Sequence, residues 1–367
     1  MNYDIIIVGG GASGLFAAIA ALKQNKRVLV IEKMKQCGLK LRITGKGRAN
    51  ITNVSELDEF LTHCGSDYRF LYPIFNTFFT QDTIDIFLEL GLETKIERGG
   101  RVFPKSDKSI DVFFAIIRFL ERNEKCTIIK NCEVKSVICE NGCSTGINTN
   151  VGQFFAHSII LAAGGMSYPL TGSNGDGLRI CKALGLQCTE CFPVLVGLFT
   201  ENIITTEAYR LRKKESGDTF LIKNMLVTVT NKNGKKLTQT IGEVQFTNYG
   251  IAGAAILKIS RQIAQRIAAK EDLRVILDLK QDVNFAIMRI TGTEGWDRAV
   301  ITQGGVSLLE VKPKTLETKK IKRLYLCGEL LDLDADTGGY NLQIAFSTGW
   351  VAGTNAALAA NVHNAEI

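Results

Sequence analysis

A strand–turn–helix–strand unit at the start of the chain constrains the fold more than any other feature of the sequence. Residues 5–8 are all apolar and predict a short buried strand, which leads directly into the glycine pattern G-x-G-x-x-G at residues 9–14. Apolar residues then recur at helical spacing over 13–24, and the stretch 27–31, apolar after Arg27, predicts a second buried strand that ends at Glu32. This order of elements predicts a Rossmann-type α/β fold.

The three glycines and the acidic residue of this unit each have a mechanical role in binding a dinucleotide. Gly9 permits the tight turn, Gly11 allows a pyrophosphate to approach the backbone, and Gly14 lets the helix pack closely. The carboxylate of Glu32 accepts hydrogen bonds from ribose hydroxyls and repels a 2′-phosphate. We therefore expect an ADP-containing cofactor at this turn.

The length and composition are those of a globular protein of about two domains. Apolar residues make up 46% of the 367-residue chain and charged residues 22%, which are ordinary values. Asp4 precedes the first apolar strand, glycines interrupt it, and no run approaches the roughly 18 apolar residues that span a bilayer. The chain is therefore expected to be soluble and cytoplasmic, without a membrane partner.

The net charge of +7 raises the question of a nucleic-acid partner. The lysines and arginines are scattered, and the densest group, at 210–214, lies in a loop-like stretch that also holds Glu215 and Asp218. We interpret this group as a solvated basic surface, with a site for an anionic substrate as the alternative. Because the sequence has no basic stripe interleaved with aromatic residues, it predicts no nucleic-acid partner.

The ten cysteines and three histidines form no recognisable metal or redox motif. In a chain of this type the thiols are expected to be reduced. The single C-x-x-C, at 188–191, contains Glu190, which opposes the lowered thiol pKa that a redox pair requires. His63, His157 and His363 do not have ligand spacing, so no metal site is predicted.

Three further segments favour contact with a cofactor or a substrate. The segment 36–53 is rich in glycine, cationic residues and amides, which suits a loop that wraps a phosphate or a flavin. The strand expected at 153–162 runs into small residues, so another backbone or a cofactor can come close. The turn at 98–104 either faces a substrate or only joins a helix to a strand.

The C-terminal stretch resembles the first unit in its order of a buried strand, a glycine-rich turn and a helix. A buried strand is predicted over 321–327, and a Gly-Glu pair follows at 328–329. Two glycines at 338–339 stand just before a small-residue helix over 342–360, whose first N–H groups favour negative charge. We interpret this turn as cofactor-binding, with a purely structural glycine turn as the alternative.

Between these parts the sequence changes character. From about residue 192 to 280 it alternates as strands do, and Asn-Gly at 233–234 marks a hairpin. Nothing in this stretch repeats the glycine-rich unit, so the chain has one dinucleotide fold. We predict the first part of that fold at 1–191, an inserted β-rich substrate domain at 192–311, and the C-terminal part of the fold at 312–367.

A series of sequence blocks, in order, resembles the YhiN/BaiN-like family of FAD-dependent oxidoreductases, which includes aminoacetone oxidase-like flavoproteins. At the level of fold this family is related to glutathione reductase and fumarate reductase. The likeness covers nearly the whole chain. The matching blocks are residues 9–14 with 32–33, 40–50, 100–104, 162–165 with 172–177, 242–250, 300–306, and 328–329 with 337–341.

The resemblance implies that the cofactor is FAD, bound to a domain like that of glutathione and fumarate reductases. It implies that Ser13 contacts the pyrophosphate, that the backbone of Val134 contacts adenine, and that Glu329 lies near the ribityl–phosphate stretch. The amides of Asn341 and Leu342 would approach the pyrimidine edge of the flavin. The expected cofactor-binding residues are Gly9, Gly11, Ala12, Ser13, Gly14, Glu32, Lys33, Lys40, Thr44, Gly45, Gly47, Arg48, Asn50, Val134, Ala162, Gly164, Gly165, Gly328, Glu329, Gly339, Asn341 and Leu342.

The chain departs from the family pattern in two places that bear on its chemistry. Ala49 stands where the family usually has cysteine, so a thiol role at this position is lost. The span between Asp278 and Trp296 is much shorter than the helical subdomain that many members carry near 280–296. A missing subdomain would reshape the substrate cleft, so the resemblance does not imply a particular substrate.

These observations predict a FAD-dependent oxidoreductase that reduces a small unsaturated or carbonyl-bearing substrate, with NAD(P)H as a transient reductant. Two alternatives stay open: an amine oxidase that forms peroxide, and a non-enzymatic redox sensor. Arg101 and Tyr168 are the candidates for protonating or orienting the substrate, with an ion pair or a packing role as the alternative for each. The sequence leaves the oligomeric state open.

Overall fold

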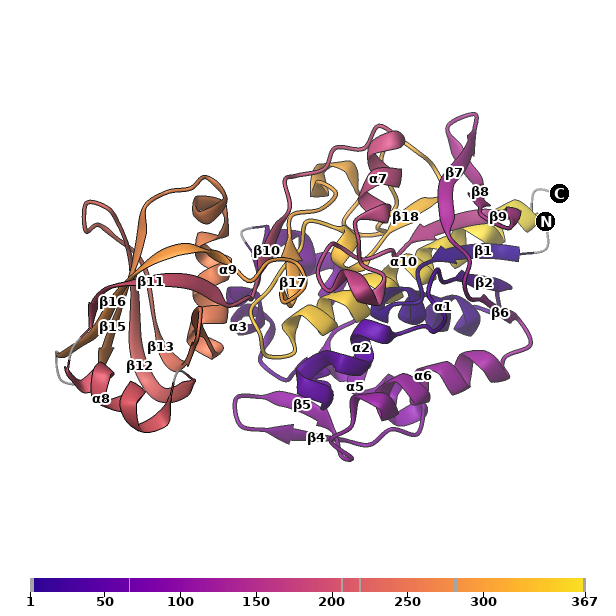
Figure 1. Ribbon diagram of the computed structural model, residues 1–367. Helices are drawn as coiled ribbons and strands as arrows, with labels where there is room; N and C mark the ends of the chain where they lie inside the picture. Colours follow the sequence, from indigo (N-terminus) through magenta and orange to yellow (C-terminus); the bar gives the residue numbers. More distant parts are fainter. Residues whose placement is uncertain (1–2, 66, 206, 218, 280–282, 366–367) are drawn as a thin grey trace. The chain divides into compact units, whose positions relative to one another are not determined.

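The computed structural model describes residues 3–65, 67–205, 207–217, 219–279 and 283–365. The chain divides into two compact units, and each unit is assembled from segments that are separate in the sequence (Figure 1). Unit 1 comprises Met1–Gly165, Leu170–Glu190 and Gly304–Ile367, and unit 2 comprises Met166–Pro169 and Cys191–Gln303.

Unit 1 is built on a seven-stranded sheet in the order β6-β2-β1-β9-β8-β7, with β18 also paired to β9. β1 (Tyr3–Val8) lies between β2 (Val28–Ile31) and β9 (Gly152–Leu161), and both neighbours run parallel to it. The isoleucines at 5–7 are fully buried, as expected of a strand that is covered on both faces. The remaining strands are β6 (Cys126–Ile129), β7 (Val134–Glu140), β8 (Cys143–Thr149) and β18 (Leu324–Leu326).

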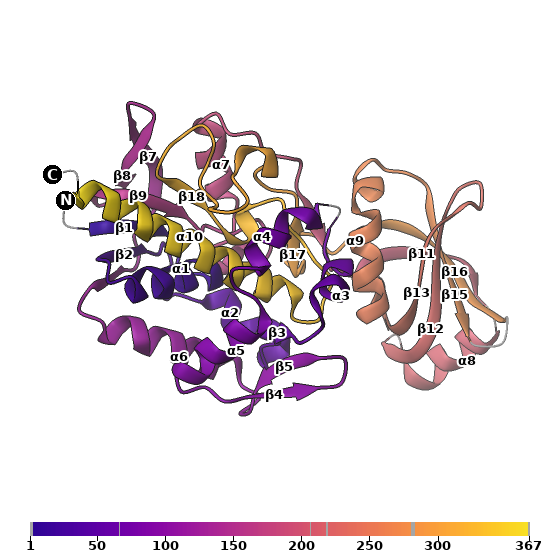
Figure 2. The same cartoon turned by 180° about the vertical axis from the view of Figure 1, so that it is seen from behind.

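Two helices of unit 1 pack closely together because glycine lies between them. α1 (Ala12–Lys23) follows the glycine turn, and α10 (Tyr340–Ala365) runs beside it (Figure 2). A Cβ on Gly349 would lie 2.1 Å from the carbonyl oxygen of Ser13, so a larger residue would force the helices apart. This packing fixes the start of α10 relative to the glycine turn.

A small sheet connects the loop after β2 to a hairpin. β3 (Thr52–Asn53) pairs with β5 (Arg101–Pro104), which pairs in turn with β4 (Thr94–Glu97), and both pairings are antiparallel.

Among the described helices, none combines the length and apolarity needed to cross a lipid bilayer. The other helices and 3₁₀ turns of unit 1 are α2 (Leu39–Ile43), η1 (Thr44–Gly47), α3 (Leu57–Thr62), η2 (Tyr68–Leu71), α4 (Tyr72–Phe75), α5 (Thr80–Glu89), α6 (Ser109–Arg122), η3 (Pro169–Thr171, which begins in unit 2), α7 (Asp176–Ala183), η4 (Leu308–Glu310) and η5 (Gly328–Leu330).

Unit 2 contains a closed barrel of strands in the order β11-β14-β13-β12-β15-β16. Alternate residues of β15 (Leu273–Leu279), such as Val275 and Leu277, are buried in its apolar core. α9 (Ala254–Ala268) adds Ile259 to the same core, so side chains fill the barrel. The other elements of unit 2 are β10 (Phe192–Val194), β11 (Leu198–Thr205), α8 (Glu207–Ser216), β12 (Phe220–Asn231), β13 (Lys236–Thr247), β14 (Gly250–Ala252), β16 (Val283–Thr293) and β17 (Ile301–Gln303).

The fold confirms the predicted Rossmann-type α/β domain with a β-rich insert, and it adds detail at the borders. The hairpin expected at 233–234 lies between β12 and β13. Within the expected shortened subdomain, residues 280–282 lie outside the described residues, and 283–296 form β16 and a turn. Residues 304–311, which we expected in the insert, belong to unit 1, where the N–H of Val306 donates to the oxygen of Leu330 at 2.8 Å.

Candidate cofactor site

Of the three glycines in the G-x-G-x-x-G pattern, two serve packing and one borders open space. A Cβ on Gly14 would lie 1.9 Å from the carbonyl oxygen of Gly9, and a Cβ on Gly9 would lie 2.4 Å from that of Ala162. Gly11 is the N-cap of α1, which begins at Ala12, and apart from its two chain neighbours no heavy atom of the described residues lies within 4 Å of its Cβ position. Because free N–H groups at a helix start favour phosphates, this space fits a pyrophosphate.

Glu32 follows β2 and directs its carboxylate at the glycine turn. Its Oε2 accepts the N–H of Gly10 at 2.9 Å, and its Oε1 accepts the N–H of Met34 at 2.8 Å. Burial raises the pKa of the Glu32 carboxyl group above its usual value. Each carboxylate oxygen has a second lone pair, so ribose hydroxyls can still donate to Glu32.

Lys33 and Val134, two further predicted cofactor residues near Glu32, differ in their contacts. The ammonium group of Lys33 forms an ion pair with Asp176, so a carboxylate of α7 already engages it. Val134 begins β7, and two residues earlier the N–H of Cys132 donates to the backbone oxygen of Glu32 at 3.0 Å. The structure therefore brings Val134 to the expected adenosine end of the site and gives Lys33 a partner within the protein.

Residues from three separate segments meet at the first turn of α1. A Cβ on Gly328 would lie 2.3 Å from the Oγ of Ser13, so this close approach requires glycine. The next residue, Glu329, accepts a hydrogen bond from the Nζ of Lys40 at 2.7 Å. This ion pair joins α2 to η5 beside α1. The residues that the resemblance associates with the phosphates and the flavin therefore lie together here: Ser13, Lys40, Gly328 and Glu329.

The end of β9 borders the glycine turn from the other side. The N–H of Ala162 donates to the oxygen of Val8 at 2.8 Å, which extends the pairing of β9 with β1. Gly164 has a φ of +73°, and the oxygen of Gly165 accepts the N–H of Gly175 at 3.1 Å. These small residues keep the backbone close to the turn, as the sequence predicts for a segment that a cofactor approaches.

Three buried side-chain oxygens, two on the 50–52 segment and one in the first turn of α10, have no hydrogen-bond partner within the described part of the chain. They are Asn50 Oδ1, Thr52 Oγ1 and Gln343 Oε1. Burying polar atoms without partners is costly, so their nearness points to a ligand with N–H and O–H groups. The ring N–H and the ribityl hydroxyls of a flavin are such groups. The residues present therefore fit the flavin half of FAD.

The segment that leads into α10 is held in place by Gly339 and Asn341. A Cβ on Gly339 would lie 2.4 Å from the carbonyl oxygen of Thr52, and its φ is +101°, so both space and conformation require glycine. The side chain of Asn341 accepts the N–H of Ala335 at 2.9 Å and donates to its oxygen at 2.8 Å. The backbone N–H groups of Asn341 and Leu342, in the first turn of the helix, are then the groups available to a flavin edge.

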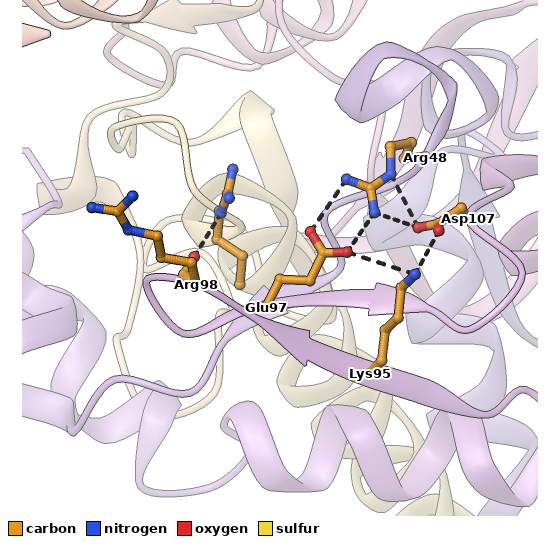
Figure 3. Close-up of polar contacts among 6 residues, drawn as sticks. Arg48, Lys95, Glu97, Arg98 and Asp107 are labelled. Atoms are coloured by element: carbon orange, nitrogen blue, oxygen red, sulfur yellow. Dashed lines mark hydrogen bonds and ion pairs between the residues drawn. The ribbon is translucent and has the colours of Figure 1, made fainter. Parts of the chain in front are cut away.

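The loop after α2 is tied down by ion pairs. Arg48 donates to Glu97 at 2.6 Å and to Asp107 (Figure 3). Its guanidinium carbon lies 4.2 Å from the centre of the Phe103 ring. Lys95 pairs with the same two carboxylates. We predicted that Arg48 contacts the flavin, and the structure places its charge on these carboxylates. Three other residues predicted to contact the cofactor, Thr44, Gly45 and Gly47, form η1 on the same loop.

Replacing Arg48 with alanine is expected to lower the affinity for FAD by about two- to fivefold, because exposed ion pairs contribute little individually. The loop would lose its links to Glu97 and Asp107 while the buried residues keep their packing. Calorimetric titration of the apoprotein with FAD measures the effect. Lys95→Ala, which removes the other cation of the network, is the control and should change the affinity less. An equal loss in both variants would contradict the loop-ordering role.

The two candidates for substrate chemistry belong to different units. Arg101 is exposed at the start of β5 in unit 1, and its Nε donates to the oxygen of Arg98 at 3.0 Å. Tyr168 belongs to unit 2, where its N–H donates to the oxygen of Trp296 at 3.0 Å. The φ of Tyr168 is +51°, a strained value for a residue with a bulky side chain. The structure does not bring the two side chains together within one unit.

Two residues that we did not predict also organise the start of α10. The Asn53 amide donates to the oxygens of Gly99 at 2.9 Å and Gly338 at 3.2 Å, so it joins the β4–β5 hairpin to this segment. The ring of His63 stacks on Tyr340 with centroids 4.4 Å apart. Asn53 is the last residue of the segment 36–53, so the sequence predicted this segment for cofactor contact but did not single out the residue.

The cysteines have the properties of structural thiols. Burial raises the pKa of Cys37, Cys126 and Cys327 to about 12 and also raises that of Cys188 in the C-x-x-C motif. A redox motif needs a lowered thiol pKa, so Cys188 does not have the property of an activated thiol. Across the described ranges, no three His, Cys, Asp or Glu side chains are placed to hold a metal ion.

Cys139, the exposed thiol of the β7–β8 hairpin, is expected to be the first to react with Ellman's reagent at pH 8. A thiol with a pKa near 12 is ionised in roughly one molecule in ten thousand at that pH, and burial also blocks access. Cys139→Ser should therefore remove the fast phase, while Cys143→Ser on the same hairpin should keep it. A fast phase that survives in Cys139→Ser would show that another thiol is activated.

Comparison with known proteins shows what the chain as a whole is similar to. The family model of the HI0933-like protein Rossmann domain matches residues 3–355. The chain is 29% identical over 418 aligned positions to the 3-dehydro-bile acid delta(4,6)-reductase of Clostridium scindens, with 96% of this chain and 98% of that protein covered. It is 24% identical over 412 positions to the ribosomal RNA dihydrouridine synthase of Escherichia coli, with 95% and 96% covered. Both alignments are longer than this 367-residue chain, so the relatives contain additional segments.

Solved structures show the same fold at low sequence identity. Quinol fumarate reductase of Escherichia coli superposes with a TM-score of 0.54 at 17% identity, covering 98% of this chain and 71% of that chain. The 3-ketosteroid-delta4-(5alpha)-dehydrogenase of Rhodococcus jostii superposes with a TM-score of 0.51 at 13% identity, covering 97% and 96%. At these identities the likenesses show the fold of the chain alone.

Proposed function

The chain belongs to the HI0933-like (YhiN/BaiN-like) family of flavin-dependent oxidoreductases, and on that premise we propose that it reduces a carbon–carbon double bond conjugated to a carbonyl group. We propose NAD(P)H as the reductant and a small molecule as the substrate. The observation that carries the proposal is the likeness, over nearly the whole chain, to two proteins whose names both denote the addition of hydrogen to such a bond.

The names of the two relatives describe one kind of chemistry on different substrates. A 3-dehydro-bile acid delta(4,6)-reductase adds hydrogen to double bonds conjugated to a ring ketone. A dihydrouridine synthase adds hydrogen to the ring double bond of uracil, which is conjugated to a carbonyl. In each reaction a hydride reaches the carbon remote from the carbonyl, and a proton reaches the carbon beside it. Both reactions fit the reductase that the sequence predicts.

FAD, when bound, supplies two-electron transfer between the reductant and the substrate. The space at Gly11 and the start of α1 would hold its pyrophosphate, and Glu32 would accept the ribose hydroxyls. Asn50, Thr52 and Gln343 would receive the polar groups of the flavin half. The N-terminus of α10 would stabilise negative charge at the pyrimidine edge, which favours the reduced form.

Uracil in RNA is the second candidate substrate. The identity of 24–25% to two ribosomal RNA dihydrouridine synthases favours it, whereas the scattered basic residues of the sequence do not. We place the small molecule first because the identity to the bile-acid reductase is higher, at 29%. Multiple-turnover assays with a conjugated ring ketone and with a uracil-containing oligonucleotide distinguish the two. Saturation of one bond with consumption of NAD(P)H identifies the substrate class.

Anaerobic mixing of the purified, FAD-loaded protein with NADPH or NADH tests the proposal. We expect the flavin absorbance at about 450 nm to bleach within seconds and to return when a conjugated ketone is added. Bleaching by amines alone, with peroxide formed in air, would instead identify an amine oxidase. A flavin that no donor reduces would identify the redox sensor. Either of the last two results would overturn the reductase.

A further inference from the structure

The Arg98–Arg101 turn of the β4–β5 hairpin differs from the other cationic positions around it. Arg48 and Lys95 are paired with Glu97 and Asp107, as Figure 3 shows, and Lys105 is paired with Glu93. Arg98 stands apart from that network in the same view. For Arg98 and Arg101, the described part of the chain provides no carboxylate at ion-pair distance. The hairpin therefore neutralises the cations at its base and leaves two arginines at its turn.

The turn between Arg98 and Arg101 is linked through Asn53 to the segment before α10. Gly99 and Gly100 have φ values of +76° and +71°, which favour glycine, and a Cβ on Gly100 would lie 2.5 Å from the Oδ1 of Asn53. Asn53 also donates to Gly99 and to Gly338, just before α10. The arginines are thus carried by a turn that is hydrogen-bonded to the segment expected beside the flavin.

The guanidinium group of Arg101 is oriented as well. Its Nε donates to the backbone oxygen of Arg98 at 3.0 Å, and its ring contact is Phe103, 5.8 Å from the guanidinium carbon. With Nε engaged, the two terminal nitrogens keep the fork geometry that binds two oxygens of one anion. Both arginines are exposed, which suits a ligand that binds and leaves during each turnover.

We propose that Arg98 and Arg101 bind the 2′-phosphate of NADPH and make the protein prefer NADPH to NADH. This inference rests on the proposed use of NAD(P)H. The chain has one glycine-rich nucleotide unit, and Glu32 in that unit would repel a 2′-phosphate, so a second nucleotide must be recognised elsewhere. A phosphate monoester carries nearly two negative charges and three acceptor oxygens at neutral pH, which match two guanidinium groups.

The test uses Arg98→Gln, Arg101→Gln and the double variant in the FAD-loaded protein. Arg122→Gln, at the exposed end of α6, is the matched control. Dissociation constants for NADPH and NADH come from the concentration dependence of anaerobic flavin reduction. We expect the double variant to bind NADPH about 10- to 100-fold more weakly, with NADH and the control changed less than about twofold. Equal losses for NADPH and NADH, or no loss, would overturn the inference.

A binding measurement that needs no electron transfer separates this inference from the proposed function. Calorimetric titration with adenosine 2′-phosphate and with adenosine should show a preference for the phosphate that the double variant loses. If neither NADPH nor NADH reduces the flavin, the proposed reductant is wrong. The titration with adenosine 2′-phosphate still tests the role of Arg98 and Arg101 in that case. Unchanged binding of adenosine 2′-phosphate in the double variant contradicts the inference. An arginine-dependent affinity for a short single-stranded RNA, without a preference for NADPH, also contradicts it.

Discussion

Replacing Gly11 with valine is expected to leave the apoprotein folded and to lower its affinity for FAD at least about 100-fold. The backbone at Gly11, with φ −81° and ψ −174°, is extended, and valine adopts this conformation readily. Apart from the two chain neighbours, no heavy atom of the described chain lies within 4 Å of the new Cβ, so the apoprotein has open space at this position. The added side chain would occupy the space that the pyrophosphate needs. Thermal unfolding without FAD and calorimetric titration with FAD measure the two effects.

Gly14→Ala is the matched control in the same glycine pattern. Its Cβ would lie 1.9 Å from the carbonyl oxygen of Gly9, so α1 must shift away from β1 for the chain to accommodate it. We expect this variant to unfold at a clearly lower temperature or to be insoluble, whereas Gly11→Val should unfold within about 2 °C of the wild type. If Gly11→Val binds FAD normally, the pyrophosphate does not lie at the start of α1.

Asn341→Asp is expected to lower the flavin midpoint potential by about 30–60 mV, equivalent to a tenfold to hundredfold change for a two-electron couple. The substitution places a negative charge in the first turn of α10, where the helix start would otherwise stabilise the reduced flavin. It also removes the amide N–H groups that hold Ala335 and Asp336, while the acceptor for the N–H of Ala335 remains. The affinity for sulfite should fall in parallel, because its adduct also carries negative charge on the flavin.

Asn355→Asp on the same helix controls for the added charge. The Asn355 amide donates to the oxygen of Val351 at 2.8 Å, well along α10 from its start. Distance and solvent screening should keep its effect on the potential below about 10 mV. Equal shifts of the midpoint potential in both variants, or no shift in Asn341→Asp, would show that the start of α10 does not tune the flavin potential. Measurement of the FAD content in each variant keeps loss of cofactor separate from a change in potential.

Much of the nucleotide end could be predicted because it is encoded locally. The strand, glycine turn, helix and second strand occur within the first 32 residues, and the buried isoleucines of β1 fix the sheet in which they pair. Glycine spacing is also a local signal, since Gly9 and Gly14 are required by contacts between neighbouring elements. Such features depend on residues that are close in the sequence, which is why the pattern identifies them.

The environment of the flavin end could not be predicted in the same detail, because it depends on contacts between distant residues. Arg48 is paired with carboxylates 49 and 59 positions later, and no local pattern shows that its charge is already engaged. Asn53 acts through a hydrogen bond to Gly338, 285 positions away. The border of the insert follows from a similar long-range contact, between Val306 and Leu330. Sequence patterns located the segments, and tertiary pairing decided what each side chain does.

The most direct test of the account is the amount and identity of flavin bound to the purified protein. Absorbance of the native protein, followed by release and chromatography of the cofactor, should show FAD in an equimolar amount, or equimolar binding when FAD is added to the apoprotein. A colourless protein that does not bind added FAD would contradict the assignment of the Gly11 turn, the buried acceptors at α10 and the reductase built on them.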